Sequence, residues 1–215
     1  TGANTRVIGI HGNFDDAQSG VKKLFADKEL AAWMEERGYQ FSSANSINIG
    51  RLVPQIVYYV YAYGSLDRIY TDPAAAVKRA DAQTGVVLNR AQQYVWERGN
   101  KKTKLQMNIE DVPESIRTAN WKKKELQDSL GDMGTVIDLT GCTLDNVLYE
   151  VSAQRPVIAK TGENSSVVIV GYDEYNTYLY DPATGQISPY GMNDSTALFE
   201  SAGNVFLTYI ENVIE

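Results

Sequence analysis

The sequence predicts a short α/β strand–helix unit at the N-terminus, joined to an α+β unit with an antiparallel sheet. A β-branched run at 6–10 is followed by a glycine turn and a helical pattern that opens with Asp15 and Asp16, which is the order of an α/β unit. Apolar runs at 167–173 and 177–181 are separated by a polar turn and alternate as in a hairpin. Helical patterns at 143–151 and 194–202 flank that hairpin.

The rest of the N-terminal quarter is expected to be helical. A short helix is predicted over 30–36, ending at Gly38. From Ile49 to Val60 apolar residues recur at helical spacing, and Pro54 lies inside that pattern. The proline either occupies the first turn of a helix starting near Arg51 or kinks a helix starting at 45. Because 58–63 is aromatic on every side, we expect this helix to be buried on more than one face.

The middle of the chain predicts a helix, two strands and a linker. Asp72 followed by Pro73 is a helix start, and Gly85 ends that helix. Short strands are expected at 86–89 and 93–96. Residues 98–131 are rich in Lys, Asn and Glu, which favours a linker or peripheral excursion with one helix near 121–130. Further on, Thr143 caps a helix, and strands are expected at 136–137, 156–159 and 205–210.

Composition excludes several classes of function. The chain has 215 residues, room for one medium domain or two small ones, and a net charge of −7, which argues against nucleic acid as a partner. A single cysteine, Cys142, and a single histidine, His11, exclude an internal disulfide and leave no metal site to expect. No stretch is long and apolar enough to span a membrane. Because the chain opens on Thr1, we expect the native N-terminus to lie further upstream.

Three strings in the first 63 residues resemble an internal slice of threonine synthase. They are VIGIHGNFDDAQ at 7–18, SANSIN at 43–48 and RLVPQIVYY at 51–59. The resemblance implies a pyridoxal-phosphate enzyme that converts phosphohomoserine to threonine, with a substrate pocket lined by Asn45, Ser46, Asn48 and Arg51. Free N–H groups at a helix start together with an arginine can hold an anion, although capping by Ser43 or Asn45 explains the same pattern.

The slice lacks the parts that its chemistry needs. In threonine synthase, the lysine that forms the Schiff base lies upstream of this region, and the glycine-rich phosphate loop lies just downstream. Without the Schiff base there is no electron sink for the reaction. Lys22 and Lys23 lie on an amphipathic surface helix, so we interpret them as solvated residues.

Residues 64–215 resemble the papain-like, bacteriocin-leader-processing peptidases of Gram-positive bacteria. The strings LTGCTLD at 139–145, RPVIAK at 155–160, VVIVGYD at 167–173 and YDP at 180–182 carry this resemblance. It places the catalytic histidine position on Ser165 and the orienting acid position on Asp181. Serine cannot act as the general base that converts a thiol into a thiolate. Cys142 matches the wrong element and has no histidine partner, so we interpret it as a core residue.

These patterns predict a composite protein without catalytic activity. Its expected parts are a threonine-synthase-like segment at 1–63, a connecting region at 64–134 and a papain-like sheet unit at 135–215. The expected function is peptide or protein binding by a degenerate peptidase module, with no cofactor. The alternative is a threonine synthase fragment, inactive alone, for which pyridoxal phosphate would be the cofactor. The first interpretation favours a secreted or cell-surface location and the second a cytoplasmic one; the oligomeric state is left open.

Overall fold

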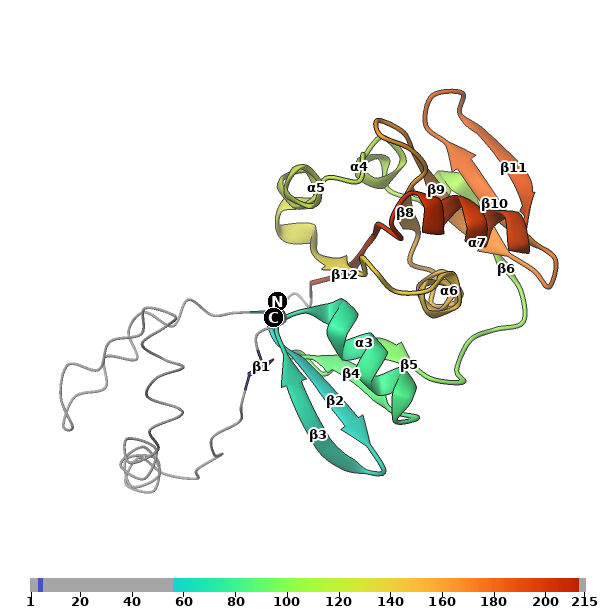
Figure 1. Cartoon of the computed structure of the whole chain (residues 1–215). Helices are drawn as coiled ribbons and strands as arrows, with labels where there is room; N and C mark the ends of the chain where they lie inside the picture. Colours follow the sequence, from blue (N-terminus) through green and yellow to red (C-terminus); the bar gives the residue numbers. More distant parts are fainter. Residues whose placement is uncertain (1–3, 6–55, 213–215) are drawn as a thin grey trace, which may run out of the picture. The chain divides into compact units, whose positions relative to one another are not determined.

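The computed structural model describes residues 4–5 and 56–212 of the chain. Contacts divide it into two compact units, Asn4–Ile56 and Val57–Glu215, the latter joined by Thr1–Ala3. The first contains the two-residue strand β1 (Asn4–Thr5). The strand and helices predicted between 6 and 55 lie outside the described residues. The second unit carries two antiparallel sheets with helices, as the predicted α+β class requires (Figure 1).

The smaller sheet is built from the first four strands of this unit. They pair antiparallel in the order β3-β2-β4-β5. Their bounds are β2 (Tyr58–Ala62), β3 (Ser65–Tyr70), β4 (Val86–Asn89) and β5 (Tyr94–Glu97). The strands β4 and β5 confirm the two short strands predicted here.

The helical pattern predicted through Val60 is wrong for its last residues, which form strand β2. Tyr58, Val60 and Ala62 are buried and the residues between them are half-buried, a period of two rather than 3.6. Aromatic and β-branched side chains fit a pleated sheet, and the turn to β3 is tight. It uses Tyr63 at φ 52° and Gly64 at φ 76°, the left-handed geometry of a two-residue hairpin.

Helix α3 (Pro73–Ala82) packs on this sheet and confirms the predicted start at Asp72. The Asp72 carboxylate accepts a hydrogen bond from the Ala74 backbone N–H, which would otherwise be unpaired at the helix end. Pro73 occupies the first turn, where no N–H is needed. The buried side of the helix is made of small residues, so its backbone approaches the sheet closely. They are Pro73, Ala74, Ala76, Val77 and Ala80.

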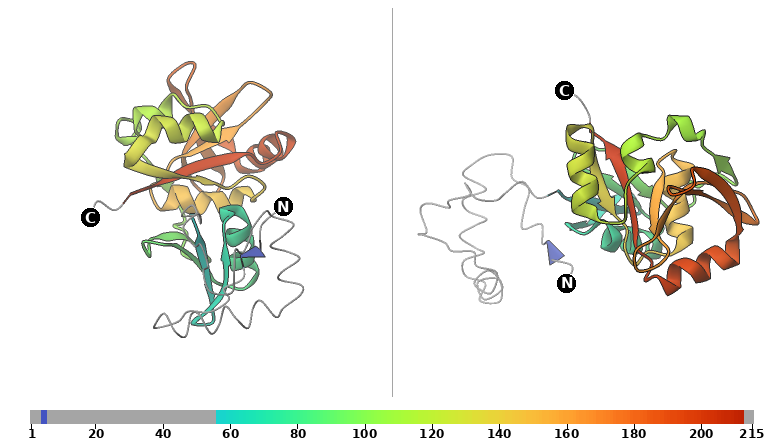
Figure 2. Two further views of the ribbon diagram at one scale, coloured as in Figure 1. Left: turned by 90° about the vertical axis from the view of Figure 1, so that its left-hand side faces the viewer. Right: turned by 90° about the horizontal axis from the view of Figure 1, so that it is seen from above.

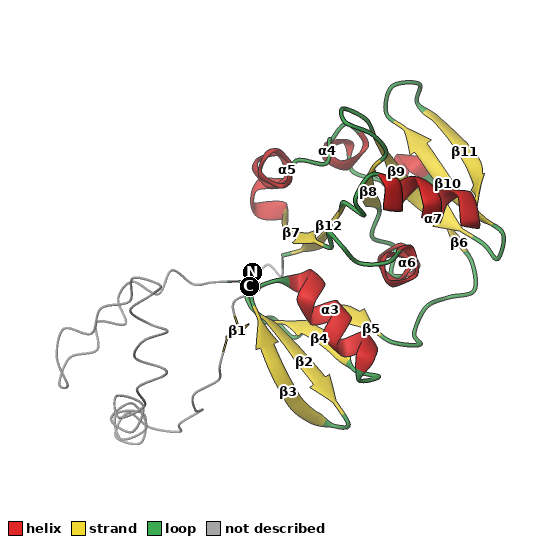
Figure 3. Cartoon of the chain, in the orientation of Figure 1, coloured by secondary structure: helices red, strands yellow, loops and turns green. Residues whose placement is uncertain are grey.

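The larger sheet has seven antiparallel strands in the order β11-β10-β9-β8-β12-β7, with β6 pairing to the end of β9 (Figure 3). The bounds are β6 (Leu105–Gln106), β7 (Gly134–Asp138), β8 (Val157–Lys160), β9 (Ser166–Tyr172), β10 (Asn176–Asp181), β11 (Gln186–Gly191) and β12 (Phe206–Glu211). The hairpin of β9 and β10 confirms the alternating runs, and β7, β8 and β12 confirm three further strands. The strands β6 and β11 were not predicted.

Helices cover both faces of this sheet. Helices α6 (Leu144–Ser152) and α7 (Met192–Ser201) pack on one face, in a core that also takes in α3 and the smaller sheet. The opposite face is covered by α4 (Glu114–Arg117) and α5 (Lys123–Leu130), with short 3-10 turns at Ile109–Asp111 and Gly131–Met133 (Figures 1 and 2). Two covered faces explain why β8 and β9 are apolar at consecutive positions.

Part of the segment predicted as a linker is packed into the core. Val112, Ile116, Leu126 and Leu130 are almost fully buried against the larger sheet. The predicted helix near 121–130 is confirmed as α5. Most residues of this segment are charged or polar, and its few apolar residues are widely spaced, so the sequence shows no clear apolar pattern here. The expected boundaries at 63/64 and 134/135 both fall inside the unit that starts at Val57.

A side chain of α5 occupies the free edge of β7. Gln127 Oε1 accepts from the Val136 N–H at 2.9 Å, and Gln127 Nε2 donates to the Gly134 carbonyl oxygen at 3.0 Å. A neighbouring strand would offer the same donor and acceptor. The amide therefore satisfies an edge that would otherwise be open to pairing with another chain.

We expect Gln127→Ala to lower the free energy of unfolding by about 1–2 kcal/mol, because two partly buried hydrogen bonds are lost at roughly 1 kcal/mol each. Lys124→Ala, an exposed change on the same helix, is the control and should cost little. Urea unfolding followed by circular dichroism measures both. Equal stability of the two variants would show that the edge contact contributes nothing.

Candidate functional site

The two residues that the peptidase resemblance singles out lie at the same end of the larger sheet. Ser165 directly precedes β9, and Asp181 ends β10. These strands are antiparallel, with Tyr180 opposite Val168, so the start of β9 lies beside the end of β10. We call this end, residues 161–165 and 181–185, the rim.

Ser165 belongs to a closed turn between β8 and β9. The Thr161 N–H donates to the Ser165 carbonyl oxygen at 2.9 Å, and the Thr161 hydroxyl donates to Ser165 Oγ at 3.0 Å. A Cβ at position 162 would lie 2.7 Å from Ser165 Oγ, so a larger residue there would displace that hydroxyl. The Ser165 residue is exposed, so its hydroxyl is available to a ligand.

Asp181 is engaged in the turn that follows it. Its Oδ1 accepts from the Ala183 N–H at 2.8 Å, and its Oδ2 accepts from the Thr184 hydroxyl at 3.1 Å. This is an Asx turn, which orders the loop into β11. No hydrogen bond joins Asp181 to Ser165 in the part of the chain that the structure describes. Both carboxylate oxygens of Asp181 therefore accept hydrogen bonds from the loop that follows it.

The other predicted site residues lie outside the described residues. They are the pocket candidates from the threonine-synthase resemblance, Asn45, Ser46, Asn48 and Arg51. His11, Lys22 and Lys23 also lie there. Within residues 56–212 no group of three or more His, Cys, Asp or Glu side chains is arranged to hold a metal ion. None of the helices in that range is long and apolar enough to cross a membrane.

Cys142 is a core residue and lies just before α6 rather than on it. Its side chain has no exposure, and its Sγ faces the Ala74 carbonyl oxygen at 3.8 Å. Burial raises the pKa of the Cys142 thiol to about 12, and the nearby Lys78 offsets only part of that rise. The thiolate is the nucleophilic form, so this thiol is inert near neutral pH.

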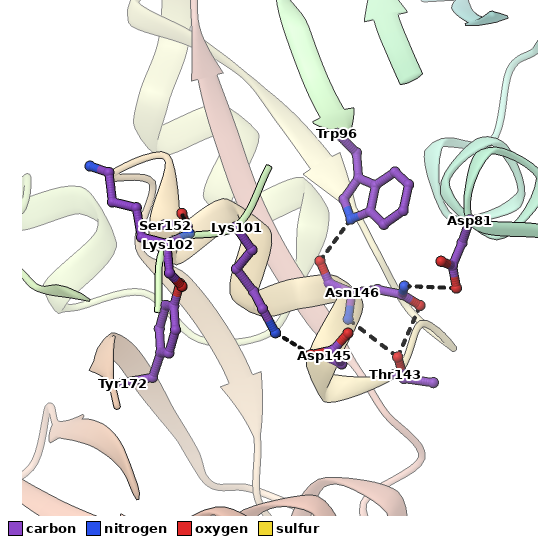
Figure 4. Close-up of polar contacts among 9 residues, drawn as sticks. All are labelled: Asp81, Trp96, Lys101, Lys102, Thr143, Asp145, Asn146, Ser152 and Tyr172. Carbon is purple, nitrogen blue, oxygen red and sulfur yellow. Dashed lines mark hydrogen bonds and ion pairs between the residues drawn. The ribbon is translucent and has the colours of Figure 1, made fainter. Parts of the chain in front are cut away.

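A polar network around α6 joins the two sheets (Figure 4). Thr143 caps the helix, as predicted, by accepting from the Asn146 N–H at 3.2 Å. The Asn146 side chain donates to Asp81 at the end of α3 at 3.2 Å, and the Asn146 backbone carbonyl oxygen accepts from the Trp96 indole of β5 at 3.0 Å. One residue of α6 thus contacts two elements of the smaller sheet layer.

Residues 98–104 cross from β5 to β6 and are tied to α6 along the way; we call them the strap. Lys101 forms an ion pair with Asp145, and the Lys102 N–H donates to Ser152 Oγ at 2.7 Å. The Tyr172 hydroxyl of β9 donates to the Lys102 carbonyl oxygen (Figure 4). Lys101 therefore holds the strap to α6 through its side chain, and Lys102 does so through its backbone.

A buried ion pair at the end of α6 was missed in the sequence. Glu150 has no exposure, and its Oε2 accepts from Arg155 Nε at 2.6 Å. Arg155 also donates to the carbonyl oxygens of Tyr94 and Val95 on β5, at 3.2 and 2.9 Å. A signal was present: Glu150 follows Val147 by three residues, which places a carboxylate beside the apolar face of the helix.

Comparison with known proteins finds threonine synthases over a short part of the chain. The threonine synthase of Buchnera aphidicola (Schizaphis graminum) is 48% identical over 62 residues, 29% of this chain and 13% of that enzyme. Threonine synthase-like 1 of Homo sapiens is 43% identical over 61 residues, 28% of this chain and 8% of that protein. The first resemblance is therefore confirmed. The chain spans only about an eighth or less of the length of these relatives.

Among solved structures, a C39-like peptidase from Bacillus anthracis aligns with a TM-score of 0.36 and 18% identity, over 43% of this chain and 58% of that one. The antiparallel α+β architecture given above rests on the strand pairing of the chain itself. No family model matches the chain.

We expect Cys142 to resist modification by thiol-specific reagents in the native chain near neutral pH, because its thiol is buried and protonated. The measurement is the rate of modification by an aromatic disulfide reagent, monitored by absorbance. In guanidinium chloride the single thiol should react promptly and stoichiometrically, which is the control. Rapid labelling of the folded chain would contradict a core position.

Proposed function

We propose that this chain is a non-catalytic composite protein whose C-terminal module binds an extended peptide at the rim beside Ser165. The observation that carries the proposal is the state of Cys142. Its thiol is enclosed in the core with a pKa raised to about 12, so it supplies no thiolate. A serine, which is not a base near neutral pH, stands at the position where the resemblance places the histidine.

The rim offers hydrogen-bonding groups without a reactive one. The exposed Ser165 hydroxyl, already fixed by Thr161, can donate to or accept from a peptide backbone. Asp181 orders the neighbouring loop, so both turns of the rim are ordered before a ligand binds. A site that is ordered in advance costs less conformational entropy on binding.

The alternative function is that of a threonine synthase fragment, favoured by the 48% identity over 62 residues. Pyridoxal phosphate would then be required as cofactor, held through a lysine Schiff base. A lysine in that role is desolvated, which lowers its pKa. In residues 56–212 every lysine is exposed or half-exposed, and Lys160 lies over the Trp121 ring. The described residues therefore do not fit the cofactor, and we propose that the chain works without it.

We expect Ser165→Arg to weaken peptide binding at least tenfold, because the long charged side chain would fill the rim. The probe is a displayed library of random unstructured peptides, with the selected sequences resynthesised and titrated by calorimetry. Ser188→Arg, an exposed change on β11, is the matched control and should bind as the unmodified chain does. Failure to select any peptide, or equal affinity in both variants, would remove the rim as a binding site.

We expect no release of threonine from phosphohomoserine, with or without added pyridoxal phosphate, because the described lysines offer no desolvated amine. Absorbance in the visible region reports Schiff-base formation independently of turnover. Intact threonine synthase serves as the positive control. Threonine release that disappears when one lysine is replaced would establish the alternative function instead.

A further inference from the structure

Glu150 on α6 is a buried acid that neither proposed function uses. It is fully enclosed, and only its Oε2 has a hydrogen-bond partner, Arg155. Within the described residues its Oε1 is buried and without any partner. An ionised carboxylate in this position has lost its water and regained one donor group, so its charged form is costly.

Arg155 connects this acid to the edge of the smaller sheet. Its two terminal nitrogens donate to the carbonyl oxygens of Tyr94 and Val95, and its guanidinium lies 5.8 Å from the centre of the Tyr149 ring. The Arg155 side chain keeps 19% of its exposure. The arginine therefore retains two carbonyl partners and access to water whether or not Glu150 is charged.

The remaining groups around α6 do not neutralise Glu150. Elements packed on the helix are β5, β8, β9 and α7. Their titratable residues are Tyr94 and Glu97 on β5, Lys160 on β8, Tyr172 on β9, and Asp194 and Glu200 on α7. In the described part of the chain none of these is hydrogen-bonded to Glu150. Three further groups feel its charge, Tyr58, Cys142 and Tyr149, and all are neutral near neutral pH because burial raises their pKa values. Arg155 is the cation that pairs with it.

We propose that Glu150, Arg155 and strand β5 form a proton-controlled junction between α6 and the smaller sheet. The junction is closed while Glu150 carries a proton, and it opens on the β5 side when Glu150 ionises. Opening there is the least costly route for water, because β5 pairs with β4 alone among the described strands. Tyr94 at its start is already 54% exposed.

The direction of the pH effect follows from the closed state binding the proton more tightly. Burial raises the pKa of Glu150 above its ordinary 4.5, and Arg155 offsets this only in part. Once the junction opens, water restores the ordinary value. Opening therefore releases one proton, and its equilibrium constant rises up to about tenfold per pH unit between the ordinary and the raised pKa. Stability from this group is complete below the ordinary pKa and is lost as pH rises through the raised one.

Amide hydrogen exchange of the intact chain across a pH series tests the junction. Rates are expressed as protection factors relative to an unfolded peptide at the same pH, which removes hydroxide catalysis. Protection of the Val95 and Trp96 amides should fall with rising pH by up to about tenfold per unit. Protection of Ile158 and Ile169, in the middle of the larger sheet, should stay level.

Two variants that each remove one negative charge distinguish ionisation of Glu150 from a change in the net charge of the chain. In Glu150→Gln the protection of β5 should become independent of pH, because no proton is exchanged. In Glu97→Gln, on β5 itself, the slope should persist. The proposal would be overturned if the pH dependence of β5 protection survived in Glu150→Gln. It would also be overturned if protection of β5 in the unmodified chain rose with increasing pH.

Carbon NMR of glutamate carboxyl groups in the unmodified chain gives a test that needs no variant to fold. One glutamate should titrate at a clearly higher pH than the others. The midpoint of its titration should match the pH above which protection of the β5 amides stops falling. Titration of every glutamate within the ordinary range would equally overturn the junction.

Discussion

Helix α6 is enclosed on almost every side, so its buried polar side chains need hydrogen-bond partners from other parts of the chain. Eight of its nine residues are buried, three of them polar or charged: Asn146, Glu150 and Ser152. An unpaired buried polar group costs roughly 1–3 kcal/mol, so each of these residues needs a partner in place for the helix to be stable. The partners come from three places: Asp81 on α3, Arg155 after the helix and Lys102 in the strap.

These attachments make the two sheets interdependent. One continuous core includes Tyr58 and Val87 of the smaller sheet together with Val147 of α6 and Phe206 of the larger sheet. The contacts to Asp81 and to β5 lie on the smaller-sheet side, while the strap reaches β9 through Tyr172. Loss of the smaller sheet would leave α6 with exposed apolar surface and broken hydrogen bonds. We therefore expect residues 57–212 to unfold as one cooperative unit.

Local signals in the sequence were sufficient to predict helix starts and hairpin strands, because these depend on residues that are neighbours in the sequence. Asp72 before Pro73, Thr143 before Leu144, and the alternating runs on either side of 173–176 each predicted the observed element. Ser165 and Asp181 lie at one end of the sheet because β9 and β10 form a tight antiparallel hairpin. These inferences needed only neighbours in sequence.

Features that depend on distant partners were missed. Val112 and Ile116 looked like occasional apolar residues in a charged segment, because the sheet face that they cover is formed by strands that all come later in the chain, β7, β8, β9 and β12. Glu150 could be placed near an apolar face, but Tyr94 and Val95, whose carbonyls hold its arginine, belong to another sheet. Strand β2 was mistaken for helix because a run that is apolar or aromatic at every position carries no visible period.

Strand β2 also limits how much its own sequence matters. Only Tyr58, Val60 and Ala62 point into the core, while the intervening side chains are half-exposed and its hydrogen bonds to β3 and β4 come from the backbone. A segment of different origin can therefore close this sheet if it supplies three inward apolar groups followed by a left-handed turn. Strand β2 therefore depends on three inward side chains and little else of its own sequence, and it lies where the segment that resembles threonine synthase ends.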